Sequence, residues 1–122
     1  MNSAQPALSV VIPLYNEEDN IATLQKELAA ALSGIDHEIV FVDDGSSDQT
    51  VARVQRSPNV RLLEFEKNTG QSAAMYAGIQ AARGEVIALL DGDLQNDPAD
   101  IPKLIEEISN GADLVCGYRA QR

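Results

Sequence analysis

Two carboxylates, Asp91 and Asp93, stand two residues apart directly after the apolar run Val86–Leu90. The glycine between them allows both side chains to turn toward one point, and Gln95 adds a neutral oxygen two residues further on. Oxygen ligands of this kind suit Mg²⁺ or Mn²⁺, which proteins hold through few groups so that substrate phosphates complete the shell. Asp-Gly is also typical of a tight turn. Because it follows a buried run within an acidic segment, we predict a metal site made by Asp91, Asp93 and Gln95.

A second acidic pair, Asp43 and Asp44, follows the apolar run 38–42 and precedes Gly45 and Ser46. A carboxylate in this place can accept hydrogen bonds from the ring N–H of a nucleobase or from ribose hydroxyls. The same residues are typical of a turn that caps the next helix through a serine or through Asp48. Both interpretations can hold, with the first aspartate on a ligand and the later residues capping.

Three further segments carry side chains suited to binding. Pro13–Glu17 combines a rigid proline, the aromatic ring of Tyr15 for stacking on a flat base, and the carboxylate of Glu17, although its asparagine is equally suited to cap a helix. The segment 67–70 can place a helix N-terminus near an anion, or can be an ordinary loop. Arg119 can meet a phosphate or belong to a basic chain end.

Apolar runs alternate with helical periodicity along the whole chain. Strands are predicted at 8–12 (closed by Pro13), 38–42, 60–65, 86–90 and 113–117, and helices at 21–32, 50–56, 71–83 and 101–108. Strict alternation predicts an α/β fold with a mostly parallel sheet and helices on both faces. Ligands of such sheets bind beyond the carboxyl ends of the strands. The segments that follow the strands are therefore the ones that position the chemistry.

The distribution of charge supports this placement. The 122 residues carry 9 basic and 19 acidic side chains, a net charge of −10, which argues against nucleic acid or an anionic membrane surface as a general partner. Ten of the 19 acids fall in segments that follow three predicted strands: Glu17, Glu18, Asp19, Asp43, Asp44, Asp48, Asp91, Asp93, Asp97 and Asp100. We expect this concentration to recruit a cation that lets an anionic ligand bind.

Five motifs in this order resemble family 2 inverting glycosyltransferases of the GT-A fold, a Rossmann-like nucleotide-sugar-binding architecture. They are Pro-Leu-Tyr-Asn-Glu17, Val-Asp-Asp-Gly-Ser-Ser-Asp48, Asn-Thr-Gly-Gln-Ser72, Asp-Gly-Asp-Leu-Gln95 and Gly-Tyr-Arg119. The form Asp-Leu-Gln-x-Asp-Pro is most similar to the polyprenyl-phosphate (dolichyl- or undecaprenyl-phosphate) sugar transferases. Asn96 departs from the acid common there, which concerns the surroundings of the metal more than the metal itself.

The resemblance implies a role for each matching residue. The nucleotide pocket would be lined by Pro13, Tyr15 and Glu17, and Asp43 would hydrogen-bond the base beside Asp44. Asp91 would meet the ribose or diphosphate, and Asp93 and Gln95 would complete the metal site. Arg119 would approach the diphosphate or the acceptor phosphate. Asp93 and Arg119 are thus the implied catalytic residues. The implied reaction moves a sugar, with inversion, from a UDP- or GDP-linked donor to a polyprenyl phosphate.

Other functions stay open at this point. Residues 1–122 correspond to one donor-binding domain that stops before the acceptor-binding part, so a fragment that binds nucleotide-sugar without turnover is one alternative. Transfer to a sugar hydroxyl is another, and would need a carboxylate base. A receiver-like signalling module has a similar length, but its phosphoacceptor aspartate after the third strand and its lysine after the fifth are missing here, where those strands end in Glu64-Phe-Glu66 and Gly117-Tyr-Arg119.

Location and assembly follow from what the sequence lacks. There is no secretory signal and no apolar run of the roughly 20 residues that a membrane helix needs. We therefore expect a cytoplasmic protein, with the longer enzyme at the cytoplasmic face of a membrane. A lone Cys116 and a lone His37 argue against a disulfide and a zinc site. An uncovered sheet edge would favour a homo-oligomer.

Overall fold

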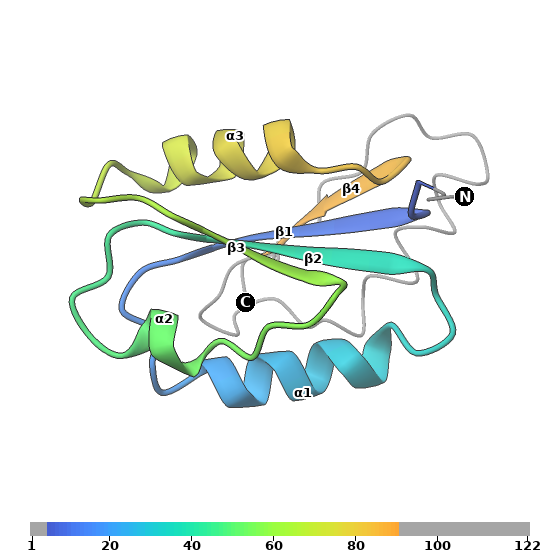
Figure 1. Cartoon of the computed structure of the whole chain (residues 1–122), viewed down its shortest axis with the longest axis horizontal. Helices are drawn as coiled ribbons and strands as arrows, with labels where there is room; N and C mark the ends of the chain where they lie inside the picture. Colours follow the sequence, from blue (N-terminus) through green and yellow to red (C-terminus); the bar gives the residue numbers. More distant parts are fainter. Residues whose placement is uncertain (1–4, 91–122) are drawn as a thin grey trace, which may run out of the picture.

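The computed structural model describes residues 5–90, which form a four-stranded sheet with helices on both faces (Figure 1). The elements are β1 (Leu8–Leu14), α1 (Ile21–Ala31), β2 (His37–Asp43), α2 (Thr50–Arg53), β3 (Val60–Glu64), α3 (Gln71–Ala81) and β4 (Val86–Leu89). The strand order is β3-β2-β1-β4, and every pair is parallel. The predicted α/β class and the parallel sheet are confirmed.

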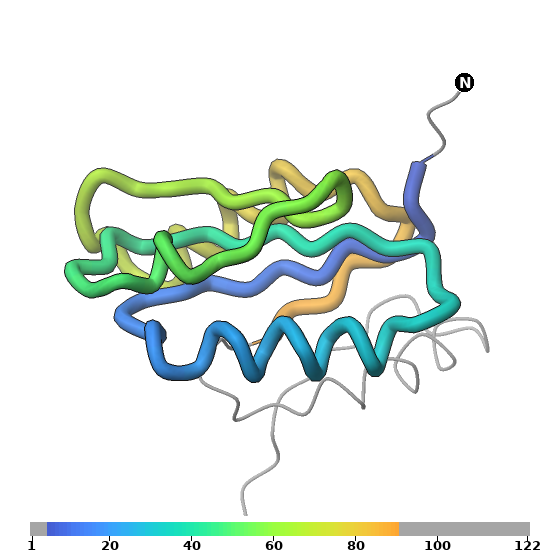
Figure 2. Tube along the Cα trace, turned by 60° about the horizontal axis from the view of Figure 1, so that its bottom comes forward, coloured from blue at the N-terminus to red at the C-terminus, as the bar shows by residue number. Residues whose placement is uncertain are grey.

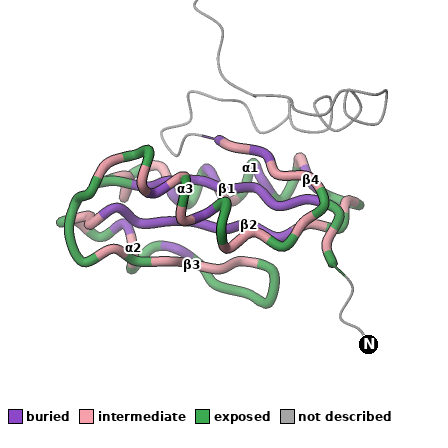
Figure 3. Tube along the Cα trace, turned by 90° about the horizontal axis from the view of Figure 1, so that it is seen from above, coloured by how far each residue is buried: buried purple, intermediate pink, exposed green. Residues whose placement is uncertain are grey.

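The sheet separates two apolar layers. Helices α1 and α2 cover one face and α3 covers the other (Figures 1 and 2). On the α1 face, Ile21, Leu24 and Leu28 of the helix pack with alternate residues of the strands, such as Val10 and Ile12. The other set of alternate residues, including Val11, Val40 and Val42, packs beneath Ala74 of α3. Figure 3 shows β1 and β2 as the most continuously buried strands.

Gly78 explains how closely α3 approaches the sheet. A Cβ atom at Gly78 would overlap the side chain of Val11 and press on Val42. Glycine at residue 78 therefore lets the α3 backbone lie close to the sheet.

Pro13 lies inside β1, so the prediction that it closes the strand is wrong. It pairs in register with Val42, and the strand runs on to Leu14. Backbone groups of a strand point alternately to its two neighbours: the Val11 carbonyl accepts from Leu90 on the β4 side, and the Leu14 carbonyl accepts from Asp44 on the β2 side. Pro13 therefore faces the β4 side beyond the end of β4, where a missing N–H costs no ladder hydrogen bond.

Several boundaries also differ from the predictions. Helix α2 ends at Arg53 rather than 56, because Val54 is already extended, with ψ 124°. Helix α3 ends at Ala81 rather than 83, because the Arg83 N–H donates to the Glu38 carboxylate instead of continuing the helix.

The apolar run 86–90 predicts a buried strand, β4. It lies at the end of the four described strands, and three of its four residues are only partly buried. The predicted helix 101–108 and strand 113–117 lie outside the described residues. Among residues 5–90, none of the helices has the length and apolar character needed to span a bilayer.

Candidate functional site

The segments that follow β1 and β2 meet at the carboxyl edge of the sheet and are joined by hydrogen bonds. The Asn16 N–H donates to the Ser46 hydroxyl at 2.8 Å, and the Ser47 N–H donates back to the Asn16 side-chain oxygen at 2.9 Å. One residue further, the Glu17 N–H donates to the Thr50 hydroxyl at 2.8 Å. Residues about thirty apart in sequence therefore form one cross-linked surface, as the strand order predicts.

Asn16 shapes this surface by its backbone. Its φ of 51° lies in the left-handed region, which asparagine tolerates better than most residues. The suggestion that Asn16 caps a helix is not borne out, since the N-cap of α1 is Asn20. The sharp turn at Asn16 leaves the preceding Tyr15 46% exposed at the edge, where its ring is free to stack on a planar group.

Asp43, at the end of β2, is 2% exposed and faces the next turn. Its two oxygens accept hydrogen bonds from the Ser46 N–H at 2.9 Å and from the Ser46 hydroxyl at 2.5 Å. Each carboxylate oxygen can accept two hydrogen bonds. Asp43 therefore keeps capacity for a donor supplied by a ligand.

Asp44 is 4% exposed, and its carboxylate accepts hydrogen bonds from the segment 67–70. It accepts the Thr69 N–H at 2.7 Å, the Gly70 N–H at 2.9 Å and the Asn68 side-chain amide at 3.0 Å. Gly70 is the N-cap of α3. The sequence pointed to an anion at this helix N-terminus, and in the described residues the carboxylate of Asp44 is placed there.

Gly45 allows the turn after β2 to touch the same segment. Its φ is 74°, and a Cβ atom would overlap the backbone of Lys67 and Asn68. A side chain at residue 45 would push the two segments apart. This contact and the hydrogen bonds to Asp44 fix the segment 67–70 beside the end of β2.

Asp48 holds the start of α2. It accepts hydrogen bonds from the N–H and hydroxyl of Thr50 and from the Glu18 N–H, while Gln49 is the N-cap. Partial desolvation acts to raise the pKa of Asp48, but these hydrogen bonds outweigh it and hold the pKa below the ordinary value of 3.8. Asp48 thus stays ionised at the edge.

The predicted nucleotide-pocket residues of the described region gather at this edge. Pro13 is buried beneath it, Tyr15 is exposed on it, Glu17 is half-buried, and Asp43 and Asp44 lie at the end of the neighbouring strand. The remaining predicted site residues lie outside the described residues: Asp91, Asp93, Gln95 and Arg119. Within residues 5–90, no group of three His, Cys, Asp or Glu side chains is arranged to hold a metal.

A separate groove of about 590 Å³ runs along α1 and contains none of the predicted site residues. Lys26, Arg53 and Arg56 are among its lining residues. Two of these cations are directed elsewhere, because Arg53 donates to the Glu18 carbonyl and Arg56 pairs with Glu64 at 3.3 Å. The groove therefore does not focus positive charge on one point.

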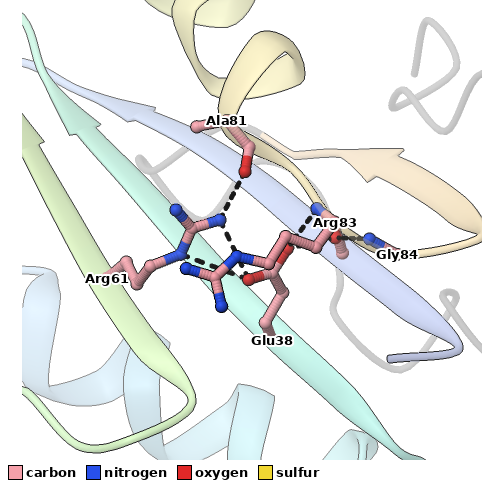
Figure 4. A network of polar contacts seen from close by, with 6 residues as sticks. Glu38, Arg61, Ala81, Arg83 and Gly84 are labelled. Atoms are coloured by element: carbon pink, nitrogen blue, oxygen red, sulfur yellow. Dashed lines mark hydrogen bonds and ion pairs between the residues drawn. The ribbon is translucent and has the colours of Figure 1, made fainter. Parts of the chain in front are cut away.

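A polar network that was not predicted from the sequence lies at the opposite, amino-terminal end of the strands. The carboxylate of Glu38 accepts hydrogen bonds from the Ser9 hydroxyl at 2.6 Å, the Arg83 N–H at 2.7 Å and the Arg61 guanidinium at 3.0 Å (Figure 4). Ser9, Glu38 and Arg61 each occupy the second position of a strand. Three polar residues, each at the second position of its strand, were the available signal.

The network keeps Glu38 charged although the residue is only 6% exposed. Burial acts to raise the pKa of Glu38, but the hydrogen bonds from Ser9, Arg83 and Arg61, with the positive charge of Arg61, outweigh it. They hold the pKa below the ordinary value of 4.5. An ionised, fully engaged carboxylate at this end is a structural element, in contrast to the open edge opposite.

Known proteins are similar to this chain both in sequence and in fold. The chain is 43% identical to a dodecaprenyl-phosphate galacturonate synthase of Rhizobium johnstonii, over 94% of this chain and 36% of that protein. It is 42% identical to a dolichol-phosphate mannosyltransferase of Pyrococcus furiosus, over 92% of this chain and 33% of that protein. The chain therefore spans about a third of the length of these curated relatives.

Solved structures show the same architecture. Glucosyl-3-phosphoglycerate synthase of Mycobacterium tuberculosis in complex with UDP superposes with a TM-score of 0.71 at 25% identity, over 87% of this chain and 41% of that one. A mannosyltransferase of Pyrobaculum calidifontis in complex with GDP-Man and Mn²⁺ gives 0.68 at 25% identity, over 80% and 30%. Residues 9–122 match the family described as Glycosyl transferase family 2. The chain belongs to glycosyl transferase family 2 and has the GT-A fold.

Proposed function

We propose that this chain is the donor-binding part of a transferase that moves a sugar, with inversion, from a nucleoside diphosphate to a polyprenyl phosphate. The observation that carries the proposal is the hydrogen-bonded surface formed by Tyr15–Glu17 and Asp43–Thr50 at the carboxyl edge of the sheet. The relatives named for dodecaprenyl- and dolichol-phosphate support the acceptor class.

The described residues of this surface hold the nucleotide by ring stacking, by hydrogen bonding and by fixing a neighbouring segment. Tyr15 offers an exposed ring to the base, and Asp43 keeps lone pairs for a base N–H or a hydroxyl. Asp44 and Gly45 hold the segment 67–70 against the end of β2. The base is therefore bound between a stacking surface and a hydrogen-bond acceptor, each fixed by backbone contacts.

The donor set that follows β4 in the sequence fits a hard divalent cation, since Asp91, Asp93 and Gln95 supply only oxygen ligands. The complex of a structural neighbour with GDP-Man and Mn²⁺ supports the same class of cofactor, Mg²⁺ or Mn²⁺. A bound cation would stabilise the negative charge of the departing diphosphate as a Lewis acid. Arg119 would add positive charge toward the diphosphate or the acceptor phosphate.

The acceptor decides whether a general base is needed. A phosphate acceptor is already ionised near neutral pH, so its oxygen can attack the anomeric carbon while the carbon–diphosphate bond breaks on the opposite face. A sugar hydroxyl would instead require a carboxylate to remove its proton. The polyprenyl-phosphate relatives favour the first case. The location that we propose for the longer enzyme is the cytoplasmic face of a membrane.

Calorimetric titration of UDP and GDP, each with Mn²⁺ or with a chelator, tests the donor site. We expect metal-dependent binding of one nucleotide that Asp93→Ala abolishes and that Asp97→Ala, a control in the same acidic segment, retains. Equal binding in the chelator would contradict the metal site, and no binding of either nucleotide would contradict the donor site.

The acceptor is tested separately in a longer protein that contains this chain. Transfer from the bound nucleotide-sugar is measured to a polyprenyl phosphate and to a free sugar. We expect product only from the lipid phosphate. Transfer to the sugar hydroxyl alone would replace the proposed acceptor class, and binding without any transfer would reduce the chain to a nucleotide-sugar-binding module.

A further inference from the structure

The connection between α3 and β4 crosses directly over the start of β1. A Cβ atom at Gly84 would lie 2.6 Å from the Ser9 nitrogen and 2.7 Å from the Leu8 carbonyl carbon. Real Cβ atoms do not approach backbone atoms so closely, so only glycine fits here without displacing the chain. The connection is therefore pressed against the β1 backbone two residues before β4 begins.

Hydrogen bonds fix the same connection to three strands (Figure 4). The Gly84 N–H donates to the Ser9 hydroxyl at 2.7 Å, and the Arg83 N–H donates to Glu38 at 2.7 Å. Arg61 donates both to Glu38 and, at 2.5 Å, to the Ala81 carbonyl at the end of α3. We call Ser9, Glu38 and Arg61 the amino-end clamp. Its members come from β1, β2 and β3, and its partners lie in the segment that leads into β4.

Strand β4 needs such a fixed point because its own sequence does not select a register. The run Val86–Leu90 is apolar at every position, so a slip of one residue would still place apolar side chains on both faces. Register is strongly specified only where the two faces differ. In the described residues β4 pairs with β1 alone, through four residue pairs. A one-residue slip would shift the end of β4 along β1 by about 3.3 Å.

We propose that Glu38 is a positioning residue for the donor site, acting through the amino-end clamp to set the register of β4. The last described contact of this strand is the Leu90 N–H to the Val11 carbonyl at 3.0 Å, and Asp91 is the next residue in the sequence. The inference rests on the proposed function, since Asp91 and Asp93 are its proposed metal ligands. Glu38 itself lies at the opposite end of the strands and touches no donor.

Nucleotide binding to the whole chain tests the proposal. The affinity for UDP and GDP is measured with Mn²⁺ and with a chelator, at a temperature where circular dichroism shows every variant folded. We expect Glu38→Gln to weaken the Mn²⁺-dependent binding about tenfold, as loss of a group that orients metal ligands does. Binding in the chelator should not change. A merely structural role would lower the melting temperature and leave the ratio of these affinities intact, and an unchanged ratio overturns the proposal.

Two further variants keep the test decisive. Glu85→Gln removes the same charge next to the clamp from an exposed side chain, and should leave the ratio unchanged. Ser9→Ala removes only the hydroxyl that joins Glu38 to Gly84, so it serves if Glu38→Gln does not fold. Its expected loss is about threefold, smaller than for Glu38→Gln because the contacts of Glu38 with Arg61 and Arg83 remain. A folded Ser9→Ala with the unaltered ratio also overturns the proposal.

Amide hydrogen exchange separates failure of this inference from failure of the proposed function. If the unmodified chain binds neither nucleotide, the donor site is wrong, and exchange at Leu90 still reports on β4. The clamp predicts that Ser9→Ala speeds exchange at Leu90 at least about threefold, while the amide of Val42 in β2 is unaffected. Equal protection of Leu90 in both proteins overturns the positioning role.

Discussion

Buried carboxylates at the two ends of the sheet have different kinds of partners. At the amino end, Glu38 is matched by a guanidinium of the same chain, Arg61, which is itself largely covered. At the carboxyl end, Asp43 and Asp44 are held by hydroxyl, amide and backbone N–H groups, and Tyr15 stays exposed beside them. The amino end balances its charge internally. Among the described residues, neutral groups alone hold Asp43 and Asp44 at the carboxyl end.

The largest expected effect comes from breaking the internally balanced end. Glu38→Ala leaves Arg61 partly buried without its carboxylate, and should lower the free energy of unfolding by about 3–5 kcal/mol. Glu64→Ala is the matched control, because its pair with Arg56 is half-exposed on both sides, and should cost at most about 1 kcal/mol. Urea unfolding of both variants checks this, and similar losses would show that the clamp is no stronger than a surface pair.

A smaller effect separates the two aspartates at the carboxyl end. Asp44→Asn deprives the Thr69 and Gly70 N–H groups of their anionic acceptor and should cost about 2 kcal/mol. Asp43→Asn affects, among the described residues, the two hydrogen bonds from Ser46 and should cost about 1 kcal/mol.

Nucleotide affinity should follow the opposite order, with Asp43→Asn the more damaging. Unfolding in urea and titration with the nucleotide that binds give both numbers for each variant. If Asp44→Asn proves worse in both measurements, Asp44 also contacts the ligand.

The smallest expected effect is that of acid pH on the stability contributed by Glu38. Because the folded pKa of Glu38 is lowered, its carboxylate contributes stability above about pH 4.5 and loses that contribution as the pH falls through the folded pKa. The difference in unfolding free energy between the unmodified chain and Glu38→Gln should therefore shrink from pH 7 to pH 3.5. Melting curves across this range measure it, and a constant difference would mean that the pKa of Glu38 is not lowered in the folded state.

The order of the elements and the edge that carries the site were predictable from the sequence. Apolar runs alternating with helical periodicity specify a parallel sheet, and parallel strands put the segments after Leu14 and Asp43 at one edge. The inner connections were not predictable. Asn68 looked like one residue of a polar loop, and only its distance of 3.0 Å from the Asp44 carboxylate shows what holds that loop.

Glu38 was missed for a related physical reason. A charge at the start of a strand is usually solvated, and the sequence does not state that Ser9, Arg61 and the end of α3 converge on it. Periodicity reports which face a side chain occupies. It does not report which polar groups from distant segments share that face, because their positions depend on tertiary contacts.

Pro13 marks where the sheet gives way to the binding edge. A neighbour running on past Leu90 along β1 would need a donor from Pro13, and the pyrrolidine ring has none. Pairing on that side of β1 thus has a built-in stopping point, while on the other side it continues to Leu14. Among the described residues, β1 pairs with β4 as far as Val11 and with β2 as far as Leu14.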